Sequence, residues 1–135
     1  MMNIQQSLVH LQSDGRLIEQ LCQQLEHLIE YSPYQQSHID LAFLELVACI
    51  QEQNHRRSAL MKATNYPLTT QICQKQGKFL RALHAIVLQW QEQQEINRLR
   101  IEYKKLMPTA KTEHQHLEQA FVTYIEQYIH EHDAN

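Results

Sequence analysis

Residues 79–107 read FLRALHAIVLQWQEQQEINRLRIEYKKLM, and this stretch decides the fold because its apolar residues recur at helical spacing. A first apolar stripe consists of Phe79, Leu83, Ile86, Val87 and Trp90. A second stripe, on a different face of the helix, consists of Ile96, Leu99, Tyr103 and Leu106. The polar run 91–95 separates the two stripes. We expect one helix from Thr69 or Thr70 to Met107 that either breaks at this run or buries two faces.

The N-terminal segment, residues 4–31, also has helical spacing. Its seam consists of Ile4, Leu8, Leu11, Gly15, Ile18, Cys22, Leu25 and Ile29. We expect one long helix that ends at Tyr31-Ser32-Pro33, with Gly15 as a weak point because glycine costs about 1 kcal/mol in a helix interior. The alternative is a short helix and a longer one, with Asp14 as the N-cap of the second.

A further helix is expected after Ser37, whose hydroxyl can cap the first turn while Asp40 complements the helix dipole. The sequence Asn65-Tyr66-Pro67 is expected to end it. A polar gap follows Ile50 in its apolar stripe. The apolar residues of this helix are Phe43, Val47, Ile50, Leu60 and Met61.

The last helix is expected to follow Pro108, which should end the helix before it. Thr112 and Gln115 have the spacing of a capping box at its start. Its apolar residues are Leu117, Phe121, Tyr124, Tyr128 and Ile129. Four amphipathic helices with short connections predict an all-α antiparallel bundle of about four helices.

The composition agrees with this fold class. The chain has 135 residues, two glycines, three prolines and twenty glutamines, and 43% of its residues are hydrophobic. Glutamine keeps its side-chain freedom in a helix, and few glycines and prolines mean few turns. The length fits a single domain over residues 1–135, and the hydrophobic content indicates a folded chain.

The net charge of -3 hides a strong segmentation of charge. Residues 1–54 carry seven acids and one arginine, which gives -6, and residues 112–135 carry five acids and no Lys or Arg, which gives -5. Residues 55–111 carry eleven basic residues and three acids, which gives +8. The acidic ends can neutralise the basic centre, or the centre can bind an acidic partner.

The cysteines and the apolar runs indicate a cytoplasmic protein. The strongest apolar run, LAFLELVACI at 41–50, is about half as long as a membrane span and contains Glu45. The N-terminus has no basic leader followed by a long apolar run. Because no run is long enough to cross a membrane, we expect no membrane partner. The chain has three cysteines, Cys22, Cys49 and Cys73, which form no CxxC pair, so we expect free, buried thiols.

No motif for catalysis or for a cofactor occurs. There is no GxSxG, no glycine-rich phosphate loop and no HExxH. Two ExxH spacings, Glu52 with His55 and Glu113 with His116, match those of di-metal bundles, where Glu26 and Glu95 would be further ligands. Nine histidines make such spacings expected by chance. We therefore expect neither an enzyme nor a metal site.

Three stretches between about residue 40 and residue 107 resemble a known family. They are LELVACIQEQNHRRSALM, LRALHAIVLQW and EINRLRIEYKKLM, and their pattern is similar to that of the small helical flagellar export chaperones of the FliT and FlgN type. The resemblance covers about half of the chain. It implies a bacterial protein that keeps a secretion subunit soluble before export. It also implies a C-terminal helix that regulates access of the partner, here the acidic segment from Thr112.

We therefore predict a non-catalytic protein-binding module, as an adaptor, an export chaperone or a regulatory subunit. An apolar stripe with a basic rim suits an amphipathic acidic helix of a partner, or a second copy of the chain. If residues Phe121, Tyr124 and Tyr128 cover the stripe, it is core instead. The alternative function is association with nucleic acid through the basic middle segment. The predicted partner-binding residues are Ile96, Leu99, Tyr103, Leu106, Arg98, Arg100, Lys104 and Lys105.

Overall fold

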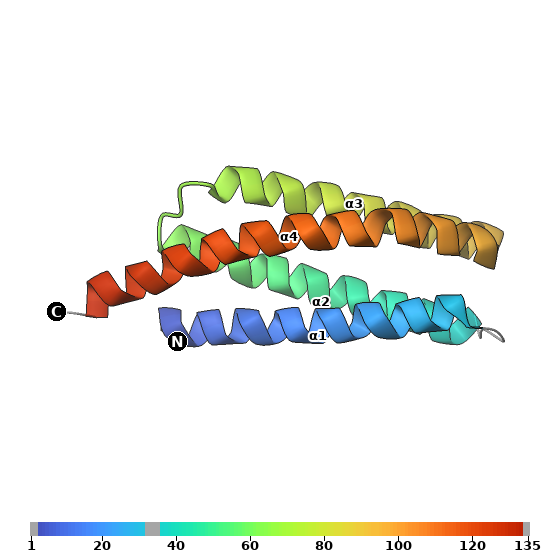
Figure 1. Ribbon diagram of the computed structural model, residues 1–135, viewed down its shortest axis with the longest axis horizontal. Coiled ribbons are helices and arrows are strands. Elements are labelled where there is room, and N and C mark those ends of the chain that lie inside the picture. Colours follow the sequence, from blue (N-terminus) through green and yellow to red (C-terminus); the bar gives the residue numbers. More distant parts are fainter. Residues whose placement is uncertain (1–2, 32–35, 134–135) are drawn as a thin grey trace.

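The apolar stripes of the chain form four α-helices that pack antiparallel. The computed structural model describes residues 3–31 and 36–133. The helices are α1 (Ile4–Glu30), α2 (Gln36–Ala63), α3 (Thr69–Gln93) and α4 (Ile96–Asp133). Each helix contacts the next one, and α1 also contacts α4, so the bundle closes on itself. The ends of α1 and α4 near the chain termini lie at the same end of the bundle (Figure 1). The predicted all-α antiparallel bundle is confirmed.

The polar run 91–95 ends a helix, so of the two predicted alternatives the break at this run is confirmed and continuation to Met107 is not observed. Gln94 has a φ of 54°, in the left-handed region that terminates helices. Its backbone N–H and its Nε2 both donate to the carbonyl of Trp90, at 2.9 and 3.0 Å. The chain then turns directly into α4. The two apolar stripes therefore belong to two antiparallel helices, which explains why they lie on different faces.

Pro108 does not end a helix, and the predicted start at Thr112 is also wrong. Pro108 lies inside α4, where it has no N–H to donate to the carbonyl of Lys104. The hydroxyl of Thr112 donates to the carbonyl of Pro108 at 3.1 Å and caps no helix. Buried residues on both sides of Pro108, such as Tyr103 and Phe121, keep the helix continuous and offset its cost of about 3 kcal/mol.

The first helix is continuous, as predicted, and Gly15 does not break it. A β-carbon at Gly15 would lie 3.4 Å from Nε2 of Gln53, so α1 and α2 approach closely here. The sequence analysis missed the N-terminal capping box of α1, in which Gln6 N–H donates to Asn3 Oδ1 at 2.7 Å and Asn3 N–H to Gln6 Oε1 at 3.1 Å.

The bounds of α2 differ at one end from the prediction. Ser37 lies inside α2, which begins at Gln36, so its predicted role as a cap is wrong. The predicted stop at Ser32-Pro33 lies outside the described residues. At the other end, α2 stops at Ala63, and Asn65 has a φ of 54°, which confirms the predicted turn before Pro67.

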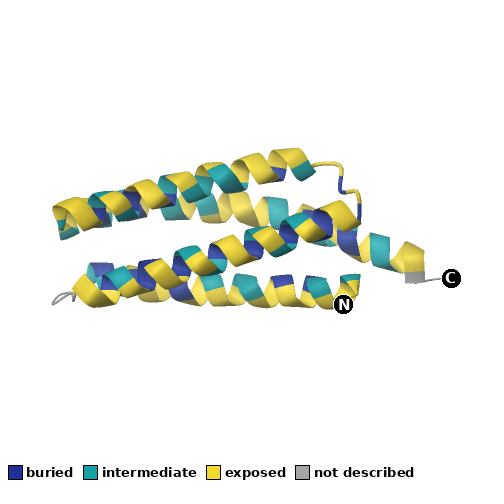
Figure 2. Ribbon diagram, turned by 180° about the vertical axis from the view of Figure 1, so that it is seen from behind, coloured by how far each residue is buried: buried dark blue, intermediate teal, exposed yellow. Residues whose placement is uncertain are grey.

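The buried apolar residues form two clusters at opposite ends of the bundle. In Figure 2 they appear as dark blue bands on the inner sides of the helices. The first cluster consists of Leu21, Leu25, Ile29, Ile39, Ala42, Phe43, Leu46, Ile50, Leu83, Ile86, Trp90, Leu99 and Tyr103. The second cluster consists of Leu8, Leu11, Leu60, Met61, Tyr66, Ile72, Phe121 and Ile125. Within the described residues, no helix is apolar enough over a sufficient length to span a bilayer.

Candidate functional site

The predicted partner-binding stripe is part of the first cluster. Leu99 and Tyr103 are each 3% exposed, and Ile96 and Leu106 are half-buried against the same cluster. The hydroxyl of Tyr103 donates to the carbonyl of Cys22 at 3.0 Å, and its ring meets that of Phe43 edge-on. Residues of α1 and α2 cover the stripe. It is therefore core without any contribution from Phe121, Tyr124 or Tyr128.

The predicted basic rim fastens the start of α4 to its neighbours. Arg100 donates to the carbonyl of Ile29 at 3.0 Å, and Lys104 pairs with Glu30 at 2.6 Å. Arg98 donates to Gln93 at the end of α3, and Lys105 lies 3.8 Å from Glu102 within α4 itself. Arg100 and Lys104 therefore fasten the start of α4 to α1.

Other basic residues of the middle segment, residues 55–111, also pair with acids of the chain. Seven of its eleven basic residues form ion pairs, and six of the seven pair with acids from the two acidic end segments. Only Lys105 pairs with an acid of the middle segment alone. The seven are Arg56, Arg57, Lys75, Arg100, Lys104, Lys105 and Lys111. The acidic ends thus neutralise much of the basic centre by folding against it.

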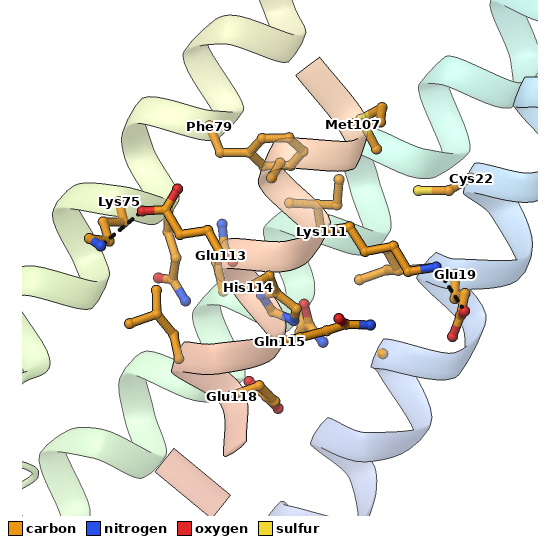
Figure 3. A pocket seen from close by; sticks show the side chains of 18 of the residues that line it. Glu19, Cys22, Lys75, Phe79, Met107, Lys111, Glu113, His114, Gln115 and Glu118 are labelled. Atoms are coloured by element: carbon orange, nitrogen blue, oxygen red, sulfur yellow. Dashed lines mark hydrogen bonds and ion pairs between the residues drawn. The ribbon is translucent and has the colours of Figure 1, made fainter. Parts of the chain in front are cut away.

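A pocket of about 420 Å³ separates the two apolar clusters. Residues of all four helices line it, and residues 107–118 of α4 cover it. Figure 3 shows Phe79, Met107, Lys111 and His114 around this space. The pocket lies where Pro108 interrupts the hydrogen bonding of α4. Its apolar lining residues include Ile18, Ile50, Ile72, Phe79, Met107 and Leu117.

A buried arginine borders the pocket, and sequence reasoning missed it. Arg57 is 2% exposed, and its Nε and Nη2 donate to Oε2 of Glu118 at 3.1 and 2.7 Å. Gln53, one turn earlier on α2, is 4% exposed. Both positions continue the spacing of three and four that begins with Ile50. The polar gap in the apolar stripe of α2 was therefore a signal for polar groups inside the bundle.

Two exposed ion pairs flank the pocket. Lys75 lies 2.8 Å from Glu113 across α3 and α4, and Lys111 lies 3.4 Å from Glu19 across α4 and α1. Figure 3 shows both pairs as dashed lines. The hydrogen bond and the charge of Lys75 lower the pKa of Glu113. The pocket is thus closed at its sides by polar contacts, which are weaker than buried apolar packing.

His114 projects from α4 beside Arg57 and Glu118. Its side chain is exposed and lines the pocket. Desolvation by nearby protein atoms lowers the pKa of His114, the positive charge of Arg57 lowers it further, and the charge of Glu118 opposes the shift. His114 is therefore a neutral imidazole at neutral pH, able to donate one hydrogen bond and to accept another.

The thiols do not form a reactive centre. Burial raises the pKa of Cys22 to about 11 and also raises that of Cys49, so both favour the unreactive protonated form. The expectation that all three thiols are buried is wrong, because Cys73 is exposed on α3 and Cys22 and Cys49 are half-buried. The sulfur of Cys73 lies 3.7 Å from the hydroxyl of Ser58.

The two ExxH spacings are not brought together. Glu52 pairs with Arg56 on the surface of α2, and Glu113 pairs with Lys75. Over residues 3–31 and 36–133, no three His, Cys, Asp or Glu side chains are placed so that they hold a metal ion. Comparisons with protein-family models, curated proteins and solved structures found no match for this chain.

Proposed function

We propose that this protein is a non-catalytic helical module that binds an amphipathic, acidic helix of a partner protein. The proposed site is the groove of α1, α2 and α3 that the C-terminal half of α4, residues 109–133, now fills. The observation that carries the proposal is the nature of this occupant. It is itself an amphipathic helix with five acids and Lys111 as its only Lys or Arg.

The groove offers an apolar floor for such a helix. Leu8 and Leu11 of α1, Leu60 and Met61 of α2, and Ile72 of α3 form this floor. From α4, Phe121 and Ile125 enter it completely, with 0% exposure each. Two large side chains one turn apart are the kind of anchor that helix-in-groove binding uses. A partner helix with the same spacing would bury the same surface.

The charges of the groove favour an acidic helix. Arg57 and Lys75 face α4 from α2 and α3, and they pair with its residues Glu118 and Glu113. A partner helix that lacked these acids would leave Arg57 buried without a counter-charge, which is costly. Charge therefore selects among amphipathic helices.

The pocket lowers the cost of moving α4 aside. Between the buried residues Tyr103 and Phe121, α4 passes over the 420 Å³ space. No residue of this stretch is fully buried, and three ion pairs together with the half-buried side chains Leu106, Met107 and Leu117 hold it. Segments with few buried apolar contacts open more easily than the rest of a fold. The resemblance of residues 40–107 to flagellar export chaperones leads to the same expectation of a regulatory C-terminal helix.

The pairing of the basic residues favours this function over association with nucleic acid. Phosphate binding needs several basic residues free on one surface. Here seven of eleven pair with acids of the same chain. Nucleic acid would have to compete with each of these pairs.

The test uses a labelled peptide of residues 112–133 as a stand-in for the partner helix. The full chain with Phe121→Ser and Ile125→Ser should bind this peptide at least about tenfold more tightly than the unchanged chain. In the unchanged chain, the tethered α4 competes at an effective concentration on the order of millimolar. Fluorescence anisotropy measures both affinities.

Two controls make the test decisive. A peptide with serine at positions 121 and 125 should not bind, and a peptide with Glu113→Gln and Glu118→Gln should bind more weakly than the original. Circular dichroism checks that α1 to α3 of the variant stay helical. If the helical variant fails to bind the original peptide, the groove does not accept a helix in trans and the proposal fails.

A further inference from the structure

A hydrogen-bond donor without an acceptor among the described residues lies beside the pocket. Gln76 of α3 is half-buried and lines the pocket, and its Nε2 has almost no accessible surface and donates no hydrogen bond among those residues. An amide removed from water without an acceptor costs free energy, and such groups are rare in folded proteins. An acceptor atom supplied from outside the chain would remove this cost.

Arg57 brings further donors to the same space. Its two hydrogen bonds to Glu118 use Nε and Nη2. A guanidinium has five N–H groups, so Nη1 retains two that can serve a guest in the pocket. Arg57 lines the pocket although it is 2% exposed. Donors from α2 and α3 therefore border one pocket.

The rest of the pocket suits an apolar body. Most of the pocket wall is apolar surface, to which the carbon atoms of polar side chains also contribute, and its volume of about 420 Å³ is within the range of small-molecule sites. Pockets between helices of a bundle are a common place for such ligands. The size and the lining indicate a guest of one or two rings or a comparable chain.

The charge of the lining selects against an anion. Four acids, Glu19, Glu26, Glu113 and Glu118, and three basic residues, Arg57, Lys75 and Lys111, line the pocket, which gives -1 with a neutral His114. Glu118 already neutralises Arg57 at 2.7 Å. A carboxylate placed at Nη1 would lie close to that of Glu118 and be repelled.

We propose that this pocket is a binding site for an uncharged, mainly apolar molecule that carries an oxygen acceptor such as a carbonyl group. The acceptor receives a hydrogen bond from Nη1 of Arg57 and, once the side-chain amide of Gln76 turns toward the pocket, a second one from its Nε2, and the apolar body fills the space between the two core clusters. This site shares Ile72, Arg57 and Lys75 with the helix groove and is formed when α4 is in place, and its ligand does not depend on the proposed partner helix.

Three matched probes test the ligand class on the full chain. Benzophenone has two rings and a carbonyl group, diphenylmethane has the same rings without the carbonyl, and 4-benzoylbenzoate adds a negative charge. Benzophenone should bind about three- to tenfold more tightly than diphenylmethane, which is the factor that one hydrogen bond contributes. It should also shift the side-chain amide signals of Gln76 in an ¹H–¹⁵N spectrum. 4-Benzoylbenzoate should bind more weakly than benzophenone.

Two variants of α3 locate the donor. Gln76→Leu should reduce the preference for benzophenone over diphenylmethane, because only Arg57 still donates to the carbonyl, and it should not weaken the binding of diphenylmethane. Gln74→Leu, at an exposed position of the same helix, should change neither affinity. Equal binding of benzophenone and diphenylmethane to the unchanged chain would overturn the proposal, as would tighter binding of 4-benzoylbenzoate or no binding of any probe. None of these outcomes affects the peptide test of the helix groove.

Discussion

The two halves of α4 are held in different ways. Before Pro108, Leu99 and Tyr103 lie in the larger core cluster, and two side chains of this half donate to backbone carbonyls of α1. After Pro108, the helix first passes over the pocket and then reaches the smaller cluster through Phe121 and Ile125. One half is fixed mainly by apolar packing and by hydrogen bonds to α1. The other is fixed by ion pairs beside the pocket and, beyond it, by Phe121, Ile125 and the hydrogen bond from Tyr124 to the carbonyl of Thr64.

The two kinds of attachment should open at different free energies. Buried apolar packing with satisfied hydrogen bonds gives a part of the fold that opens only on global unfolding. A segment attached through partly exposed ion pairs opens at lower free energy. The first half of α4 closes the bundle, and the part of the second half that passes over the pocket is expected to open first.

The largest loss of stability is expected from a substitution in the first half of α4. Leu99→Ala removes a side chain that is 3% exposed, so the free energy of unfolding should fall by about 2–5 kcal/mol. Ile101→Ala, two residues away and 55% exposed, is the control and should change it by less than about 0.5 kcal/mol. Urea denaturation measures both values. A small loss for Leu99→Ala would mean that this half is not core.

In the second half of α4, the buried ion pair between Arg57 and Glu118 should contribute more to the free energy of unfolding than the exposed pair between Lys75 and Glu113. Glu118→Gln leaves the guanidinium of Arg57 without its counter-charge, so the free energy of unfolding should fall by about 1–3 kcal/mol. Glu113→Gln, which breaks the exposed pair with Lys75, should cause a smaller loss that disappears with added salt. Equal losses in the two variants would contradict this ranking.

As the pH falls, the packing of the second half of α4 should lose stability before that of the first half. The pKa of His114 is lowered in the folded state, so the unfolded chain binds the proton more readily. The stability that this contributes is present above the usual histidine pKa of about 6.5 and is lost as the pH falls below it. His114→Gln should flatten stability between about pH 6.5 and 5. Protection of residues 109–130 from hydrogen exchange, relative to the intrinsic exchange rate at each pH, should decrease over the same range in the unchanged chain alone.

The reactivity of the cysteines tests how firmly the first half of α4 is held, without any substitution. Cys22 lies beneath the first half of α4, where its carbonyl accepts from Tyr103 and its pKa is raised to about 11. Cys73 is exposed on α3. A thiol reagent at pH 8 should therefore label Cys73 first and Cys22 last, as peptide mapping by mass spectrometry can follow. Early labelling of Cys22 would show that the first half of α4 opens readily.

The helices themselves were predictable because their signal is local. The spacing of Leu8, Leu11, Leu25 and Ile29 repeats every turn, and α1 is continuous over this whole stretch. The shift of face after residues 91–95 indicated either a break or a second buried face. The structure has the break, because Gln94 takes a left-handed conformation. Local rules failed at Pro108, where burial on both sides overrides the cost of one proline.

The pocket could not be predicted in the same way. Gln53 and Arg57 occupy inward positions of α2, but their residue types indicated a surface. Arg57 is buried because Glu118, 61 residues later in the chain, reaches it from α4. The spacing within α2 contains no information about that partner. The same holds for Gln76, whose side chain is enclosed only by the neighbouring helices.

The sequence by itself determined four amphipathic helices and the acidic-basic-acidic order of their charges, since periodicity and composition act within a segment. Only the tertiary structure decided that the stripe of Leu99 and Tyr103 is core, that the acidic ends pair with the basic centre, and that a pocket remains between two apolar clusters. The physical reason is that burial and ion pairing depend on which helices become neighbours. That arrangement is a property of the packed bundle and is not encoded in any single segment.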